Sequence, residues 1–314
     1  MVEMLIALVV TMVVTAGALT LALSSRNLFA LDAARTRLNE SIRGSRDFLM
    51  TDIRQVGERL GPTFPAIEIV SGDDLPGGQT GDPDQLVLRR NLLDTTLRSC
   101  RSVDNNDRRI YISGLGEDDN SHDDPQPGCV ALPDSDGDGW PDNHQVWRDY
   151  REGNGEEMAG RPTVPAFLYN PQTGEGEFFL YTKDDNDDAY IETTSGHSWT
   201  HDYPADDQCR VFLLEERRYR LEGDLLQLIV NQDDARPLNL VDGIRDFQLW
   251  ARFKIPPLPA AQVEPPALDS FGPGDDWTVL RAIEVRVNGR VVFKNEFIER
   301  EWSSEILPRN VLSR

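Results

Sequence analysis

The first sixty residues constrain this chain more than any other stretch. Glu3 is the only charged residue before Arg26, so residues 4–25 form a run of 22 residues without an ionisable side chain. Because a helix rises about 1.5 Å per residue, such a run spans roughly 30 Å, which is the thickness of the hydrocarbon core of a bilayer. The sequence therefore predicts a helix over residues 4–25 that crosses a membrane or lies in an equally apolar place.

The chain shows no helix-breaking sequence after Ser25 and continues to a stop at Gly61-Pro62. Beyond Arg26 the apolar residues recur at spacings of three, four and seven, with Arg, Asp and Glu between them; they are Leu31, Leu38, Ile42, Leu49, Ile53, Val56 and Leu60. That spacing is typical of an amphipathic helix. We therefore expect one long helix over residues 1–60, with an all-apolar part over 1–25 and an amphipathic part over 26–60.

After Pro62 the hydrophobic pattern changes from helical to alternating, which predicts β-strands. Turn residues between the alternating segments indicate hairpins. The strongest of these signals is Asn288-Gly289, a type I′ turn sequence that is expected to join strands over 280–287 and 290–297. The expected fold class is α+β, in which the long N-terminal helix packs on a mostly antiparallel β-sheet head over residues 61–314.

An acidic stretch near residues 116–149 has few aliphatic residues and predicts an insertion of surface structure. Within it the segment DSDGDGWPD carries carboxylates at positions one, three, five and nine, with glycine at six, which is the pattern of a calcium-binding loop. The candidate metal residues are Asp134, Asp136, Asp138, Trp140 and Asp142. Position twelve is Gln145 rather than Glu, which favours a modest calcium affinity. A solvated acidic turn is the alternative.

The three cysteines of the chain, Cys100, Cys129 and Cys209, include no C-x-x-C pair. Cys100 and Cys129 are the preferred disulfide candidates, because they flank the same polar stretch and would close a short loop. The other pairings and a fully reduced chain remain open.

The net charge of −22, from 54 acidic and 32 basic residues, argues against direct nucleic-acid binding, which depends on clustered Lys and Arg. The sequence also contains no GxSxG, HExxH or phosphate-binding glycine loop. We therefore expect no enzymatic activity.

The segment MVEMLIAL resembles the N-terminal methylation motif of type IV prepilins, in which a basic leader is cleaved before Phe and the mature chain reads roughly F-T-L-[IV]-E-[LM]-[LM]-[IV]-A-[LM]. Residues 2–8 match the core of that pattern. Because the leader is missing, we expect the natural precursor to begin before Met1. The resemblance implies that Glu3 pairs with the N-terminal amine of a neighbouring subunit during filament growth. Access of Glu3 to water at the helix end is the alternative.

The C-terminal half carries the order Y-R-L-x-G-x-L and then V-x-G-I-x-D-F-Q, which is similar to large minor pilins of the PilW type and to J-type pseudopilins of type II secretion. This resemblance implies a minor pilin that helps to initiate a type IV pilus or sits at its tip. The implied partners are other minor pilins, the major pilin, a tip adhesin and the inner-membrane assembly machinery. The implied location is the bacterial inner membrane before assembly and the extracellular filament afterwards. A type II secretion pseudopilin and a membrane-anchored calcium-dependent adhesin remain open as alternatives.

Overall fold

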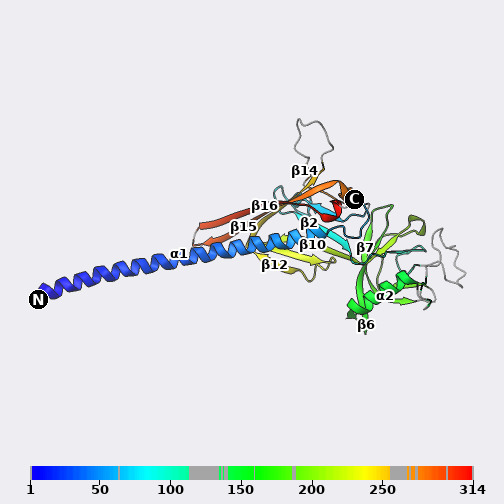
Figure 1. The fold of residues 1–314 in the computed structure, drawn as a ribbon, viewed down its shortest axis with the longest axis horizontal. Coiled ribbons are helices and arrows are strands. Elements are labelled where there is room, and N and C mark those ends of the chain that lie inside the picture. Colours follow the sequence, from blue (N-terminus) through cyan, green and yellow to red (C-terminus); the bar gives the residue numbers. More distant parts are fainter. Residues whose placement is uncertain are drawn as a thin grey trace, which may run out of the picture.

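The computed structural model describes residues 2–62, 64–112, 134–135, 137, 141–158, 160–185, 189–254, 267–268, 270–272, 275–294 and 296–312. Its first element is helix α1 (Val2–Gln55), which is 54 residues long. The helix projects from a head of mostly antiparallel strands, with the N-terminus at the far end of the projection (Figure 1). The expected combination of a long apolar helix and an antiparallel head, an α+β fold, is therefore present.

The two halves of α1 have different surroundings. The described side chains up to Ala30 are exposed, whereas one face of the second half is buried against the head. The buried positions of that face recur every three or four residues; they are Leu38, Ser41, Ile42, Ser45, Leu49, Asp52 and Ile53. This stripe agrees with the predicted amphipathic part, but the helix ends at Gln55 instead of residue 60. Gly57 turns the chain with a φ of 72°.

Two sheets enclose the second half of α1. The first has the strand order β1 (Ile67–Val70), β2 (Gln85–Asn91), β10 (Leu214–Glu222), β11 (Leu225–Val230) and β12 (Leu238–Asp242). The second has the order β14 (Ala267–Leu268), β13 (Ile244–Phe253), β15 (Leu280–Phe293) and β16 (Glu296–Ile306). The short elements η1 (Gly72–Asp74), η3 (Trp277–Val279) and α3 (Arg309–Leu312) complete this half. Helix α1 and both sheets share one core, which includes Leu49, Ile53, Tyr219, Phe247 and Trp277.

A third sheet lies at the end of the head that is remote from the N-terminus (Figure 1). Its strand order is β3 (Leu97–Arg98), β9 (Arg210–Phe212), β6 (Arg161–Tyr169), β7 (Gly176–Asp185), β8 (Tyr190–Thr193) and β4 (Arg109–Tyr111), and β5 (Glu156–Met158) pairs with β6. The 3-10 turn η2 (Ala205–Asp207) precedes β9. Helix α2 (Asp142–Asn154) packs on β6 and β7, and its Trp147 is fully buried in a second core. The stretch expected as surface insertion therefore ends in a helix that supplies a core residue.

The prediction of a hairpin turn at Asn288-Gly289 is wrong. Strand β15 runs through both residues, and Gly289 pairs with Ile244 of β13 on one side and with Arg300 of β16 on the other. The glycine is needed for a different reason, since a Cβ at this position would lie 2.6 Å from Leu38 Cδ1 and 3.2 Å from Ile42 Cδ1. Gly289 is thus where α1 crosses closest to the strand, and the hairpin turns between Phe293 and Glu296 instead.

The cysteines differ in state. Cys100 is disulfide-bonded, whereas Cys209 is a buried free thiol. Burial raises the pKa of Cys209 to about 12, so this thiol stays protonated and unreactive at neutral pH. Cys129 lies outside the described residues, and its pairing with Cys100 stays a prediction.

Candidate functional site

The projecting half of α1 is the most unusual surface of the chain. It carries large apolar side chains that are exposed on all sides of the helix; they include Val2, Met4, Ile6, Leu8, Val10, Met12, Val13, Val14, Leu19, Leu21, Leu23, Leu28 and Phe29. Met4 is 83% exposed, and the most apolar 18-residue window of α1 has a mean hydropathy of 2.4. Contact of such a surface with water is unfavourable, and surfaces of this kind are usually covered by lipid or by another protein. This half of α1 could therefore serve as a membrane anchor.

The three threonine hydroxyls within this half form hydrogen bonds inside the helix. Thr11 donates its hydroxyl to the carbonyl oxygen of Ala7 at 2.7 Å, and Thr20 donates to the carbonyl oxygen of Ala16 at 2.8 Å. Thr15 donates in the same way to the carbonyl oxygen of Thr11 at 2.8 Å. A hydroxyl that already donates to its own helix adds little cost in hydrocarbon, where water is absent. These three threonines therefore suit an apolar environment.

Glu3 lies in the first turn of α1 and is exposed. Its position is favourable for a carboxylate, because the helix dipole presents partial positive charge at the N-terminus. The side chain stands at the outer end of the projection, about 80 Å of helix away from Gln55 at 1.5 Å per residue. At that position it can contact a neighbouring subunit or a membrane surface but no group of its own head.

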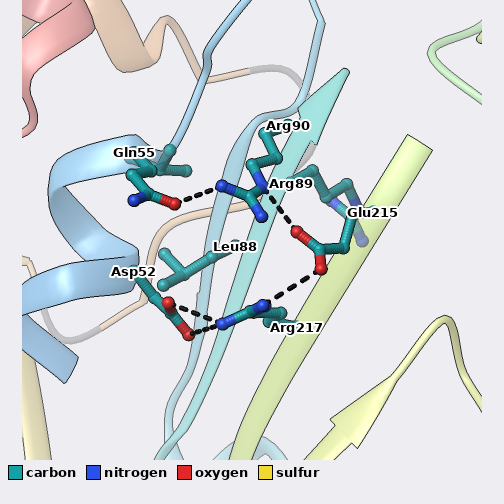
Figure 2. Close-up of a pocket in the computed structure, with 8 residues that line it drawn as sticks. Asp52, Gln55, Leu88, Arg89, Arg90, Glu215 and Arg217 are labelled. Atoms are coloured by element: carbon teal, nitrogen blue, oxygen red, sulfur yellow. Dashed lines mark hydrogen bonds and ion pairs between the residues drawn. The ribbon is translucent and has the colours of Figure 1, made fainter. Parts of the chain in front are cut away.

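A polar network fixes the other end of α1 to the first sheet (Figure 2). Asp52 is 6% exposed and accepts two hydrogen bonds from Arg217 Nη1, at 2.7 and 2.9 Å. The hydroxyl of Tyr219 donates a third to the same carboxylate. Burial alone would lower the pKa of Arg217, but the hydrogen bonds and the charge of Asp52 outweigh it and raise that pKa. Arg217 therefore stays protonated, and its hydrogen bonds to Asp52 hold α1 in one register on β10.

A second arm of this network extends to β2. Glu215 accepts a hydrogen bond from Arg217 Nη2 at 3.1 Å and another from Arg90. Arg90 in turn donates to the side-chain oxygen of Gln55, the last residue of α1. The final turn of α1 is thus tied to two neighbouring strands at once, and a rotation of the helix would break both arms.

The C-terminal end of α1 is capped by parts of the chain that are distant in sequence. Asn310 of α3 donates its amide nitrogen to the carbonyl oxygens of Val56, at 2.9 Å, and Gln55, at 3.4 Å. The ring of Trp277 covers Gly57 so closely that a Cβ on the glycine would lie 2.3 Å from Cη2 of the ring. The hydrogen bonds from Asn310 satisfy carbonyl groups that a helix end otherwise leaves unpaired, and the Trp277 ring covers the turn beside them.

The predicted calcium loop lies only partly within the described residues. Asp134 accepts a hydrogen bond from the backbone N–H of Gly137 at 2.7 Å. Asp142 accepts from the backbone N–H and the hydroxyl of Ser135, at 2.9 and 2.6 Å, and these bonds lower its pKa. The other candidates, Asp136, Asp138 and Trp140, lie outside the described residues. No group of three or more metal-ligating acids, His or Cys occurs among the residues that the structure describes, and the calcium site stays a prediction.

Helix α2 is held on the third sheet by groups that the sequence did not reveal. Arg151 Nη2 pairs with Asp184 Oδ1 of β7 at 2.5 Å, and both side chains are buried. His144 is also buried, and its loss of solvation lowers its pKa to about 4. Asp184 opens the acidic run of residues 184–188, whose sequence favours a charged hairpin tip. Only the fold shows that this acid is buried against Arg151.

Comparison of the chain with protein-family models, with curated proteins and with solved structures finds no match.

Proposed function

We propose that this chain is a minor pilin, a structural subunit that helps to initiate a type IV pilus or sits at its tip. The observation that carries the proposal is the division of α1. Its first half is apolar and exposed on all sides, while its second half is locked into a β-rich head by a buried ion pair and a helix cap. A helix of this kind can be stored in a bilayer and can leave it only for an equally apolar place, such as a bundle of identical helices.

Glu3 provides the specific element of this proposal. A carboxylate in an apolar surrounding is costly unless it is paired, so it favours arrangements in which a cation lies at the same depth. The N-terminal amine of a neighbouring subunit is such a cation. We propose that this pairing sets the axial position of the subunit among its partners, which are other minor pilins, the major pilin, a tip adhesin and the inner-membrane assembly machinery.

The proposed location follows from the same arrangement. The chain is held in the bacterial inner membrane through residues 4–25 before assembly and moves into the extracellular filament afterwards. The third sheet, with helix α2, lies at the end of the head remote from the N-terminus (Figure 1). In a filament whose core contains the apolar half of α1, this end faces outward, where calcium is available to the predicted loop.

Replacement of the gene by a Glu3→Ala variant in the producing cells tests the proposal. The expected result is fewer filaments per cell by electron microscopy, with an unchanged amount of the chain in the membrane fraction. Glu40→Ala is the matched control, because Glu40 is an exposed acid of the same helix outside the apolar run. An unchanged filament number in the Glu3→Ala cells would reject the assembly role and would favour a membrane-anchored adhesin.

A further inference from the structure

We propose that the tip of the β15–β16 hairpin is a second membrane contact, which rests against lipid headgroups when α1 spans the bilayer. The tip patch is defined here as Arg290, Val292, Phe293, Lys294 and Phe297. The inference rests on the proposed insertion of residues 4–25 in a membrane, and its occupant is a lipid surface rather than a protein.

The hairpin runs along α1 toward the N-terminus and ends partway along the helix (Figure 1). Its position is fixed at Gly289, which lies directly on Leu38 and Ile42. Strand β15 continues four residues beyond this point to Phe293, which corresponds to about 13 Å at 3.3 Å per residue. The burial pattern of α1 agrees with this estimate of how far the hairpin reaches, because Leu31 and Ala34 are the first partly shielded residues of α1 among those described. The tip therefore lies level with residues 31–34 or slightly before them.

This level corresponds to the edge of a bilayer. The apolar run ends at Ser25, six residues before Leu31, which is about 9 Å of helix. The headgroup region on each side of the hydrocarbon core is roughly 5–7 Å thick, from a total of about 40–45 Å and a core of about 30 Å. Transmembrane helices are also tilted by about 20° on average, which lowers one side of an attached head toward the lipid. The tip patch is thus within reach of the headgroups.

The side chains of the tip suit that environment. Val292 and Phe297 are a cross-strand pair, 62% and 61% exposed, and both are among the large apolar residues left uncovered on the head. Two cations accompany them, since the Arg290 guanidinium lies 4.5 Å from the centre of the Phe297 ring and Lys294 Nζ lies 5.6 Å from that of Phe293. Apolar and aromatic residues beside Lys and Arg are the combination found at membrane interfaces, where cations meet lipid phosphates.

The charge of the whole chain makes this local pattern informative. The chain has a net charge of −22 and only three lysines, of which Lys294 is one. The hairpin end also carries two exposed acids on β16, Glu296 and Glu299, the second of which pairs across the strands with Arg290; both can remain in water beside the headgroups. An acidic head would be repelled by an anionic membrane, so a contact of apolar side chains and cations at a point where the acids are balanced fixes which side of the head faces the lipid.

Site-directed fluorescence in nanodiscs tests this proposal with the full chain. A Phe297→Cys variant is labelled with a nitrobenzoxadiazole fluorophore, and quenching is measured with lipids that carry a nitroxide on the headgroup or in mid-chain. Val14→Cys is the control for the apolar run. Val279→Cys is the control for an exposed head position in η3, the turn whose Trp277 covers Gly57 at the distant end of α1. The unsubstituted chain reports background labelling, which should be small because Cys209 is buried.

The expected result is headgroup quenching at position 297 at least three times that at position 279, with mid-chain quenching at position 14. Equal quenching at positions 297 and 279 while position 14 is quenched would overturn the tip contact and leave the membrane insertion intact. Absence of mid-chain quenching at position 14 would reject the insertion itself, and the tip contact with it.

Discussion

The Asp52→Ala substitution tests whether the buried ion pair fixes α1 on the head. Asp52 is almost fully enclosed and accepts hydrogen bonds from Arg217 and Tyr219. Truncation removes the carboxylate and leaves the guanidinium of Arg217 and the Tyr219 hydroxyl without their acceptor. Removal of one partner from a buried pair typically costs about 3–5 kcal/mol of stability.

Two features of the site make the expected loss of stability smaller than this range. The side chain of Arg217 is 32% exposed, so water can solvate part of its charge after the substitution. Arg217 also keeps its contact with Glu215. Alanine in a helix is favoured over aspartate by roughly 0.6 kcal/mol, which offsets a little more of the loss. We therefore expect the free energy of unfolding to fall by about 2–3 kcal/mol.

Chemical denaturation of the full chain in detergent, followed by tryptophan fluorescence, measures this loss. Asp47→Ala is the matched control, because Asp47 lies on the same helix with an exposed carboxylate and should change stability by less than about 0.5 kcal/mol. A double-mutant cycle with Tyr219→Phe should give a coupling energy of about 1 kcal/mol. If Asp52→Ala costs no more than Asp47→Ala, the network does not fix the helix and the reasoning fails.

Three further predictions concern other parts of the head. Burial lowers the pKa of His144 to about 4, so near pH 6.5 the unfolded chain binds a proton that the folded chain does not bind. The contribution of His144 to the free energy of unfolding is complete above pH 6.5 and falls by about 3 kcal/mol as the pH drops to 4. Denaturation at several pH values should show a weaker dependence of stability on pH in His144→Gln. Gly289→Leu should cost about 2 kcal/mol or more in the same assay, because the new side chain overlaps Leu38. Asn288→Ala should change the free energy of unfolding by less than about 0.5 kcal/mol. A turn at residues 288–289 would instead make both substitutions costly. Millimolar calcium should raise the melting temperature through residues 134–142, and the absence of a shift would remove the predicted calcium site.

Local sequence patterns predict those elements whose signal lies within a few residues. The alternating residues on either side of Glu222-Gly223-Asp224 predict a turn there. That turn joins β10 to β11, since Glu222 pairs with Leu225 and Gly223 adopts a φ of 63°. The stripe of α1 is also correct in register, because it reflects a single contact between one helix face and one core. Both features follow from residues that are neighbours in the chain.

Features that depend on distant partners could not be predicted in this way. Asn288-Gly289 has the composition of a tight turn, but the close approach of α1 gives the glycine a steric role within a continuous strand. Asp52 resembles an ordinary charged residue of a helix until Arg217 and Tyr219 are brought against it. A signal was available, because Asp52 falls between Leu49 and Ile53 on the apolar stripe, where an acid needs a buried partner.

The geometry of α1 also limits the proposed movement of this chain from a membrane into a filament. The helix is held at three levels of the head: by Gly289 against Leu38, by Arg217 on Asp52 and by Asn310 at its C-terminal end. Only about five residues of helix separate the end of the apolar run from the first shielded residue, Leu31. Because helix continues through this short segment, the head cannot pivot freely about it. Extraction of the apolar half must therefore lift the whole head away from the lipid surface, and any contact at the tip of the β15–β16 hairpin must break in the same step.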